Sequence, residues 1–347
     1  MTSEALVAGV LEVEERVVVG NINWNMKKYL IILFAIALFG CNSQQEKKDS
    51  KHIPTIGVLD LLQDETLAQA RKGFYDALAK GGFSEKDSTL KVIYRNAQGD
   101  QPTLLQACDY LISQKVDLIA TIPTISTIVT AQKTKDIPIF MMVSPSPKLA
   151  KLLDANGNPP KNLFGAYETL DYIDSSVALI KSIFPKTKKV GVIYNQAEPQ
   201  SADAFQEVKD KCKDLNLQME ILPVNNSSET QLAVQALINK GIDAFFAMPD
   251  NAVFASFETI AKACDEKKIP VFTCEVGLVA RGALVSYGAD FYQWGIQAGE
   301  QAAQFLKFNS TNDLKAEHVK IRKKVYNKET AAKYSLQFDA SFESYQK

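Results

Sequence analysis

From residue 55 onward, short apolar runs alternate with longer segments in which apolar residues recur at helical spacing. This alternation is typical of parallel sheets whose strands are joined by crossover helices. Strands are predicted at residues 56–61, 90–94, 118–122, 137–143, 190–194, 217–223, 244–247, 271–273 and 284–286. Helices are predicted at residues 67–78, 104–112, 201–215, 229–239, 253–266 and 292–308.

The second half of this pattern repeats the first. The matching pairs, in chain order, are IGVL at 56–59 with VGVIY at 190–194, VD at 116–117 with ID at 242–243, and KDIPIF at 135–140 with KKIPVF at 267–272. One such pair fits any sheet of this kind, but pairs in the same order favour a repeated unit. The predicted fold class is therefore α/β, with two similar doubly wound parallel-sheet lobes joined by a multi-crossing hinge. Ligands of such sheets bind outside the carboxyl ends of the strands, which predicts a site between the lobes.

Loops and crossings set the expected boundaries. Residues 53–160 are predicted to form the first lobe, which ends near the NGNPP loop at 156–160. Residues 161–185 are predicted to hold a crossing strand, 163–167, and a linking helix, 171–184. The second lobe is expected at 186–310. The remaining residues, 311–347, are expected to cross back and to pack on the first lobe.

The chain before residue 53 has a different character. Residues 26–41, MKKYLIILFAIALFGC, place two lysines, a short apolar run and a small residue before a cysteine, which is the order of a secretory signal. The ending LFGC resembles a bacterial lipobox, so residues 26–40 are interpreted as a lipoprotein signal peptide and Cys41 as the lipidated residue. The alternative, a transmembrane anchor, needs about 20 apolar residues. Residues 1–25 are acidic and are interpreted as a non-native extension before Met26, and residues 41–52 as a polar tether.

Composition narrows the classes of function. The 347 residues are 46% apolar, enough for two lobes with their own cores. The 39 basic and 40 acidic residues nearly cancel without a basic stripe, which disfavours a nucleic-acid partner. No nucleophile elbow or glycine-rich phosphate loop is present in the sequence, so we expect a protein that is not an enzyme.

The cysteines and histidines have no metal-binding spacing, which predicts neither a metal site nor a cofactor. Cys108, Cys212 and Cys264 lie in helical patterns among apolar residues and are interpreted as buried free thiols. Disulfides are permitted outside the cytoplasm, so the pattern alone leaves the state of these three and of Cys274 open.

Polar residues follow the predicted strands at the edge where ligands bind. Thr124 and Ser126 begin a helix after the strand at 118–122. The N–H groups and dipole of a helix start suit a carboxylate, which predicts that these hydroxyls bind a ligand carboxylate. Serine and threonine are also common helix caps, and both interpretations stand.

In the second lobe, Asp250 and Asn251 occupy the corresponding place after the strand at 244–247. A carboxylate matches a desolvated ammonium group, and an amide can donate and accept beside it. The alternative is that Asp250 caps the following helix; two polar residues in a row favour a ligand role. The same strand-end rule adds Gln63, Gln98, Asp100, Ser144, Tyr194, Asn195, Glu198, Glu275 and Asp290 as ligand-binding candidates.

Several motifs together resemble one family. They are NAQGD at 96–100, KDIP at 135–138, VGVIYN at 190–195 with Glu198 and Ser201, PDN at 249–251 and NKETAA at 327–332. On these motifs, residues 53–337 are similar to ABC-transporter substrate-binding lipoproteins of the type I periplasmic-binding fold, which include tryptophan- and tyrosine-binding members. The sequence departs from the family pattern at TIPTIS, SPSP and NQAEPQS, so the identity of the ligand is not carried over.

The resemblance implies a monomeric lipoprotein held outside the cytoplasm, with a small-molecule ligand and an ABC permease and its ATPase as partners. Capture would proceed by hinge closure, in which the ligand bridges both lobes. An amino acid, aromatic or branched, is the expected ligand. The alternative is a ligand-sensing ectodomain of a membrane signalling system, because one fold serves both functions.

Overall fold

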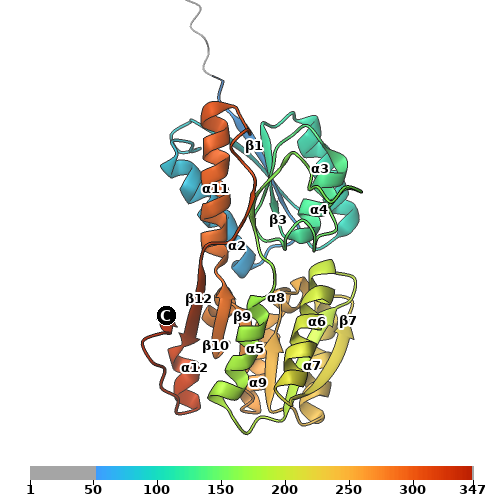
Figure 1. The fold of residues 1–347 in the computed structure, drawn as a ribbon, viewed down its shortest axis with the longest axis vertical. Helices are drawn as coiled ribbons and strands as arrows, with labels where there is room; N and C mark the ends of the chain where they lie inside the picture. The colour runs from blue at the N-terminus through green and yellow to red at the C-terminus, as the bar shows by residue number, and fades with distance from the viewer. Residues whose placement is uncertain (1–51, 346–347) are drawn as a thin grey trace, which may run out of the picture. The chain divides into compact units, whose positions relative to one another are not determined.

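The apolar runs form two sheets in the computed structural model, which describes residues 52–345 (Figure 1). The first sheet has six parallel strands in the order β11-β5-β4-β3-β1-β2. These strands are β1 (Thr55–Asp60), β2 (Lys91–Asn96), β3 (Leu118–Ile122), β4 (Ile139–Met141), β5 (Leu163–Tyr167) and β11 (Ala316–His318). This sheet and its helices are called the first lobe.

The second sheet has seven strands in the order β13-β12-β10-β9-β8-β6-β7, and only the β10–β12 pair is antiparallel among its described strands. Its strands are β6 (Lys189–Asn195), β7 (Gln218–Val224), β8 (Ala244–Ala247), β9 (Val271–Glu275), β10 (Val285–Ala289), β12 (Arg322–Asn327) and β13 (Glu343–Tyr345). This sheet and its helices are called the second lobe. The predicted fold class, two α/β lobes of mostly parallel strands, is confirmed.

The repeat seen in the sequence is also a repeat in topology. The order β4-β3-β1-β2 of the first sheet matches β9-β8-β6-β7 of the second. The carboxylate of Asp117 accepts the N–H of Thr55 at 2.7 Å, and that of Asp243 accepts the N–H groups of Lys188 and Lys189 at 2.7 and 2.8 Å. Each aspartate therefore fixes the start of the strand that lies next to the edge strand of its sheet, β1 in the first lobe and β6 in the second, which explains why it recurs.

Helices join the strands of both lobes. Those of the first lobe are α2 (Glu65–Lys80), α3 (Gln101–Ser113), α4 (Thr124–Lys133) and α11 (Phe291–Phe308). Those of the second lobe are α5 (Tyr172–Ile183), α6 (Pro199–Asp214), the 3-10 turn η1 (Ser227–Glu229), α7 (Thr230–Asn239), α8 (Asn251–Ala255), α9 (Phe257–Glu266), α10 (Val276–Ala280) and α12 (Lys328–Lys333). The single helix predicted at 253–266 is thus two helices that meet at Ser256.

Helix α11 belongs to the first lobe, whereas its residues were expected in the second lobe. It lies alongside α2 and packs on β5 and β4, as Figure 1 shows for the orange helix. Glycines permit the close approach: a Cβ on Gly295 would lie 1.9 Å from the carbonyl oxygen of Ala70, and one on Gly73 would lie 2.1 Å from that of Tyr292. The crossing to the first lobe therefore comes at residue 290, before the helix.

The C-terminal segment also differs from its expected place. Strand β11 pairs with β5 in the first lobe, but the chain then returns, and β12 pairs with β10 in the second lobe. Strand β13 continues that sheet by pairing with β12. The end of the described chain thus packs on the second lobe, where β12 and β13 extend the sheet beyond β10.

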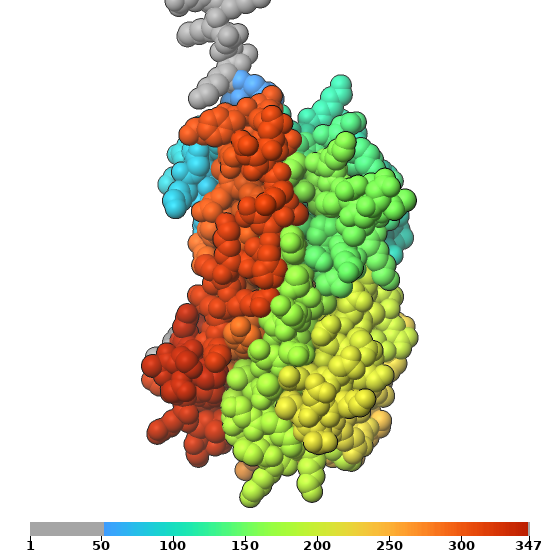
Figure 2. All heavy atoms as spheres, in the orientation of Figure 1, coloured from blue at the N-terminus to red at the C-terminus, as the bar shows by residue number. Residues whose placement is uncertain are grey.

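Three connections in the described chain join the lobes: residues 168–171 after β5, Asp290 after β10, and residues 319–321 after β11. Figure 2 shows the green segment that contains β5 and α5 side by side with the orange and red segment from α11 onward. These three connections are called the hinge.

The four cysteines of the described part are buried and free, which confirms the interpretation of Cys108, Cys212 and Cys264 and extends it to Cys274. The predicted signal peptide and Cys41 lie outside the described residues. Within residues 52–345, no helix is both long and apolar enough to cross a bilayer.

Candidate ligand-binding site

The carboxyl ends of strands from both sheets surround one pocket. Its empty space is about 390 Å³, including the solvent at its mouth, and both lobes line it. The lining residues are Pro123, Thr124, Val143, Ser144, Pro145, Glu168, Leu170, Tyr172, Gln200, Pro249, Asp250, Asn251, Phe254, Glu275, Phe291 and Trp294. The predicted candidates Thr124, Ser144, Asp250, Asn251 and Glu275 are therefore brought together. We call this space the interlobe pocket.

Aromatic side chains form much of the wall of the interlobe pocket. The ring of Phe291 lies 6.1 Å from that of Phe254 in an edge-on contact and 5.2 Å from that of Trp294. Tyr172, at the start of α5, adds a fourth ring. Aromatic walls favour a ligand with a flat or apolar group, which stacks or packs edge-on against them.

Unpartnered polar atoms are concentrated at the interlobe pocket. Five buried side-chain nitrogen or oxygen atoms in the described structure have no hydrogen-bond partner, and three of them belong to residues that line this pocket. These three atoms are Trp294 Nε1, Glu275 Oε2 and Gln200 Oε1. Buried polar groups are normally paired, so a group of unpaired ones at a pocket indicates where a ligand supplies the missing partners.

Glu275 ends β9 and is 1% exposed. Its Oε1 accepts a hydrogen bond from the hydroxyl of Tyr172 at 3.1 Å, and Oε2 is unpartnered. Burial raises the pKa of Glu275 well above its ordinary value; the Tyr172 hydrogen bond opposes this shift and the carboxylate of Glu168 adds to it. The residue is thus a buried acid with one oxygen available.

The start of α4 meets the interlobe pocket through Thr124, as predicted. No side chain caps this helix, whose N-cap is Pro123. The N–H of Ser126 donates to the carbonyl of Pro123 at 3.1 Å, so the N–H groups of Thr124 and Ile125 remain for another acceptor. Ser126 has a different role: its hydroxyl donates to the carbonyl of Ile122 at 2.7 Å, and it does not line the pocket. Both hydroxyls were predicted to bind a ligand carboxylate; the structure brings Thr124 to the pocket and leaves Ser126 bonded within the helix start.

Asp250 is fully engaged within the protein. Its Oδ1 accepts the N–H of Val253 at 3.0 Å and caps α8. Its Oδ2 accepts the N–H of Asn195 at 2.6 Å and the hydroxyl of Ser201 at 2.8 Å. Burial raises the pKa of Asp250, although these donors oppose the shift. The capping alternative is confirmed, and the carboxylate also joins β6 and α6 to β8.

A second group of polar candidates lies beside Asp250. Glu198 accepts the backbone N–H of Asn251 at 3.1 Å and its side-chain amide at 2.8 Å, and it is also bonded by Gln200. Burial, followed by the nearby Asp250, raises the pKa of Glu198 to about 8. A wider polar hollow of about 860 Å³ adjoins this group, and Asn251 is common to both spaces. Of the predicted residues, this hollow is lined by Gln63, Gln98, Asn195, Glu198 and Asn251.

Three predicted residues have structural contacts away from both spaces. Asp100 caps α3 by accepting the N–H of Thr103, and Asp290 caps α11 and forms an ion pair with Lys323. Tyr194 stacks on Phe205 at 4.5 Å. These contacts account for the three side chains without a ligand.

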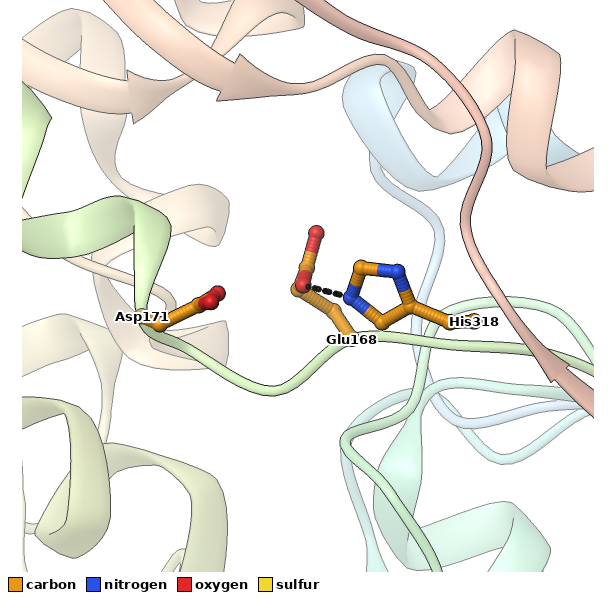
Figure 3. A group of neighbouring side chains, drawn as sticks. All are labelled: Glu168, Asp171 and His318. Carbon is orange, nitrogen blue, oxygen red and sulfur yellow. Dashed lines mark hydrogen bonds and ion pairs between the residues drawn. The ribbon is translucent and has the colours of Figure 1, made fainter.

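The hinge carries a cluster of ionisable groups. Glu168, Asp171 and His318 each offer an atom within 4.8 Å of the others, and Figure 3 shows the contact of Glu168 with His318 at 2.9 Å. The guanidinium of Arg322 donates to Glu168 at 2.5 and 3.0 Å and to Asp171 at 2.8 Å. A bound guanidinium already neutralises these acids, so the cluster is an ion-pair network across two hinge connections.

Sequence reasoning missed the aromatic wall, Gln200 and Glu168. Phe291 and Trp294 follow β10 within one helical turn of Asp290, so the strand-end rule could have found them if it had been extended by that turn. Phe254 follows Asp250 in the same way. Tyr172 and Glu168 come from the hinge, whose position relative to the pocket no local pattern reveals.

The architecture defines a protein of the type I periplasmic-binding fold. Residues 55–345 match the family of ABC transporter substrate-binding proteins, and the chain belongs to that family. Members of this family bind a substrate and are not catalysts, and they act with an ABC permease outside the cytoplasm. A tyrosine-binding protein of Clostridioides difficile (strain R20291) is 34% identical over 300 residues, 86% of each chain.

Two solved structures are also similar. One is the ABC domain from Streptococcus pneumonia in complex with L-Trp, with a TM-score of 0.75 and 26% identity over 84% of this chain and 97% of that one. The other is the ligand-free, open structure of a substrate-binding protein with adhesive properties from Clostridium difficile. Its TM-score is 0.62 and its identity 28%, over 85% of this chain and 99% of that one.

Proposed function

We propose that this protein captures an aromatic amino acid in the interlobe pocket and delivers it to an ABC importer. The observation that carries the proposal is the combination of aromatic rings with unpartnered polar atoms at one pocket between the lobes. Aromatic rings take the side chain of the ligand, and the polar atoms take its backbone groups. This narrows the earlier expectation of an aromatic or branched amino acid.

The start of α4 suits the carboxylate of such a ligand. It is an uncapped helix end, and Thr124 adds a hydroxyl beside its N–H groups. A helix start favours an anion through its dipole and its free donors. Among residues 52–345, no lysine or arginine lines the interlobe pocket, so the backbone of α4 is the donor set best placed for this role.

The relatives support the class of ligand. One is described as a tyrosine-binding protein, and another was solved with L-Trp. Both ligands carry an aromatic ring next to an ammonium and a carboxylate. A micromolar complex requires about 8 kcal/mol, which a few charge-assisted hydrogen bonds and one buried ring supply.

Closure of the lobes completes the proposed mechanism. The chain superposes better on the L-Trp complex than on the ligand-free open relative, although its identity to the two is nearly equal. Contacts between the lobes fit a closed form: Arg281, after α10, donates to Asp64 at 2.7 Å and to Thr66 at 2.9 Å at the start of α2. The ligand selects this form by adding contacts to both lobes.

A lipid on Cys41 is the proposed anchor, supported by the lipobox-like LFGC that precedes the polar tether. A Cys41→Ser variant expressed in a bacterium should move from the membrane fraction to the soluble fraction. A variant that remains in the membrane fraction contradicts the anchor at this residue.

The ligand is tested by a thermal-shift screen of residues 42–347 against the amino acids, nucleosides and sugars, followed by calorimetry. A ligand that binds the folded state at 100 times its Kd stabilises it by about 2.7 kcal/mol. We expect tyrosine, tryptophan or phenylalanine to raise Tm. A sugar or nucleoside that raises Tm while no amino acid does so overturns the proposal.

A further inference from the structure

Three carboxyl groups line the interlobe pocket, those of Glu168, Asp250 and Glu275. An amino acid brings an ammonium group, which needs an acceptor of negative charge once it leaves water. The hydrogen bonds that each carboxyl already makes decide which of them is available.

Glu168 is occupied. Its Oε1 accepts the N–H of Thr169 at 2.8 Å and contacts His318 at 2.9 Å, and both oxygens accept from Arg322. Its charge is therefore balanced within the hinge. An ammonium group would have to displace a guanidinium that also bonds Asp171.

Asp250 is occupied as well, by the donors of Val253, Asn195 and Ser201. Those donors come from three elements that meet beneath the pocket. Because the two oxygens already accept three hydrogen bonds at 2.6 to 3.0 Å, the carboxylate has little capacity left for a ligand.

Glu275 differs from both. Oε1 accepts the hydroxyl of Tyr172, while Oε2 has no partner. The groups that act on it are Tyr172 of α5, Cys274 of β9 and Glu168 of the hinge, and none of them carries positive charge. The ionised form of a buried acid is costly without a cation, and a ligand ammonium offsets that cost.

We propose that Glu275 binds the α-ammonium group of the ligand through Oε2, with Tyr172 orienting the carboxylate through Oε1. This assignment rests on the proposed function and names the residue that recognises the amine. Selectivity for a cationic amine comes from Glu275 rather than from Asp250. The ring of the ligand then lies against Phe254, Phe291 and Trp294.

The test is a cycle of two changes, one in the protein and one in the ligand. Glu275→Gln keeps the size of the side chain and an acceptor for Tyr172, but it removes the charge. The ligands are the aromatic amino acid that binds wild type and its des-amino analogue, 3-phenylpropionate, 3-(4-hydroxyphenyl)propionate or indole-3-propionate. Kd is measured for all four combinations by calorimetry at pH 7.

We expect Glu275→Gln to weaken the amino acid by about 10- to 100-fold, the range for a hydrogen bond to a charged group. The des-amino analogue should bind both proteins with the same Kd within about threefold. A matched variant, Gln200→Met, changes a neighbouring pocket residue without changing charge and should weaken both ligands by the same factor.

Other outcomes overturn the assignment. Equal losses for both ligands would place the contact of Glu275 elsewhere on the ligand, and an unchanged Kd for the amino acid would remove Glu275 from the site. Far-UV circular dichroism and Tm of the variant show whether it is folded. If wild type binds no amino acid, the proposed function fails; if wild type binds one and the variant binds it equally well, only the role of Glu275 fails.

Discussion

Asp250 and Glu275 occupy equivalent places and have different surroundings. Each is a buried acid at the carboxyl end of a strand and at the N-cap of the next short helix, α8 for Asp250 and α10 for Glu275. Asp250 accepts three hydrogen bonds from the protein. Glu275 makes no capping bond and leaves Oε2 unpartnered.

The length of the side chain explains part of the difference. Aspartate is a preferred N-cap because its short side chain reaches the N–H of the residue three positions later. Glutamate is not among the preferred N-cap residues, so its burial at a helix start provides no local stabilisation. Position relative to a strand end therefore brings an acid to the pocket, whereas its hydrogen bonds decide whether it supports the fold or serves a ligand.

The largest expected effect is on stability, and it separates the two acids. Asp250→Ala leaves three buried donors, on Asn195, Val253 and Ser201, without an acceptor. We expect the free energy of unfolding to fall by about 3 kcal/mol, since each unsatisfied buried group costs about 1 to 3 kcal/mol and relaxation with water recovers part of it. Urea denaturation of the protein without ligand measures the change.

Glu275→Gln is the matched control in the same experiment. The amide oxygen of glutamine still accepts the Tyr172 hydroxyl and the side chain keeps its size, so we expect a change of less than about 1 kcal/mol. Equal losses in both variants would mean that the two acids do not differ in the way their hydrogen bonds indicate.

The lobes themselves were predictable from the sequence because each sheet is buried on both faces and reads as short apolar runs. The bounds of β3, β5 and β8 agree with the predicted runs at every residue. The strand at 137–143 was predicted too long, because apolar residues also flank β4 outside its hydrogen-bonded part. The pair Asp117 and Asp243 marked the repeat because the two aspartates fix the starts of the equivalent strands β1 and β6.

The placement of α11 could not be predicted from amphipathicity, which shows that a helix has a buried face but not which sheet covers it. Its small residues were an unused signal, since glycines at 295 and 299 permit a close helix partner, and α2 is that partner. At the site, residue type alone could not separate Asp250 from Glu275. The distinction depends on donors such as Asn195 and Tyr172, which are distant in the sequence.

The smallest expected effect concerns Glu198, which lies beside Asp250. Burial and the charge of Asp250 raise the pKa of Glu198 from 4.5 to about 8. Because folded Glu198 holds its proton more tightly than the unfolded chain, the folded state binds more protons between these two pH values. The resulting stabilisation is complete below about pH 4.5 and is lost as pH rises towards 8. We expect wild type to lose about 1 to 2 kcal/mol of unfolding free energy from pH 5 to pH 8 through this group. The upper limit for one group over these three pH units is about 4 kcal/mol.

Glu198→Gln should abolish this part of the pH dependence, because the amide cannot titrate and still accepts the N–H of Asn251. Urea midpoints at pH 5, 6, 7 and 8 measure it, with Glu300→Gln on the exposed face of α11 as the control that keeps the wild-type profile. If the stability of Glu198→Gln depends on pH in the same way as that of wild type, Glu198 does not contribute to this pH dependence. The polar side of the pocket would then be held by hydrogen bonds alone, and the contrast with Glu275 would rest on the occupancy of oxygens rather than on charge.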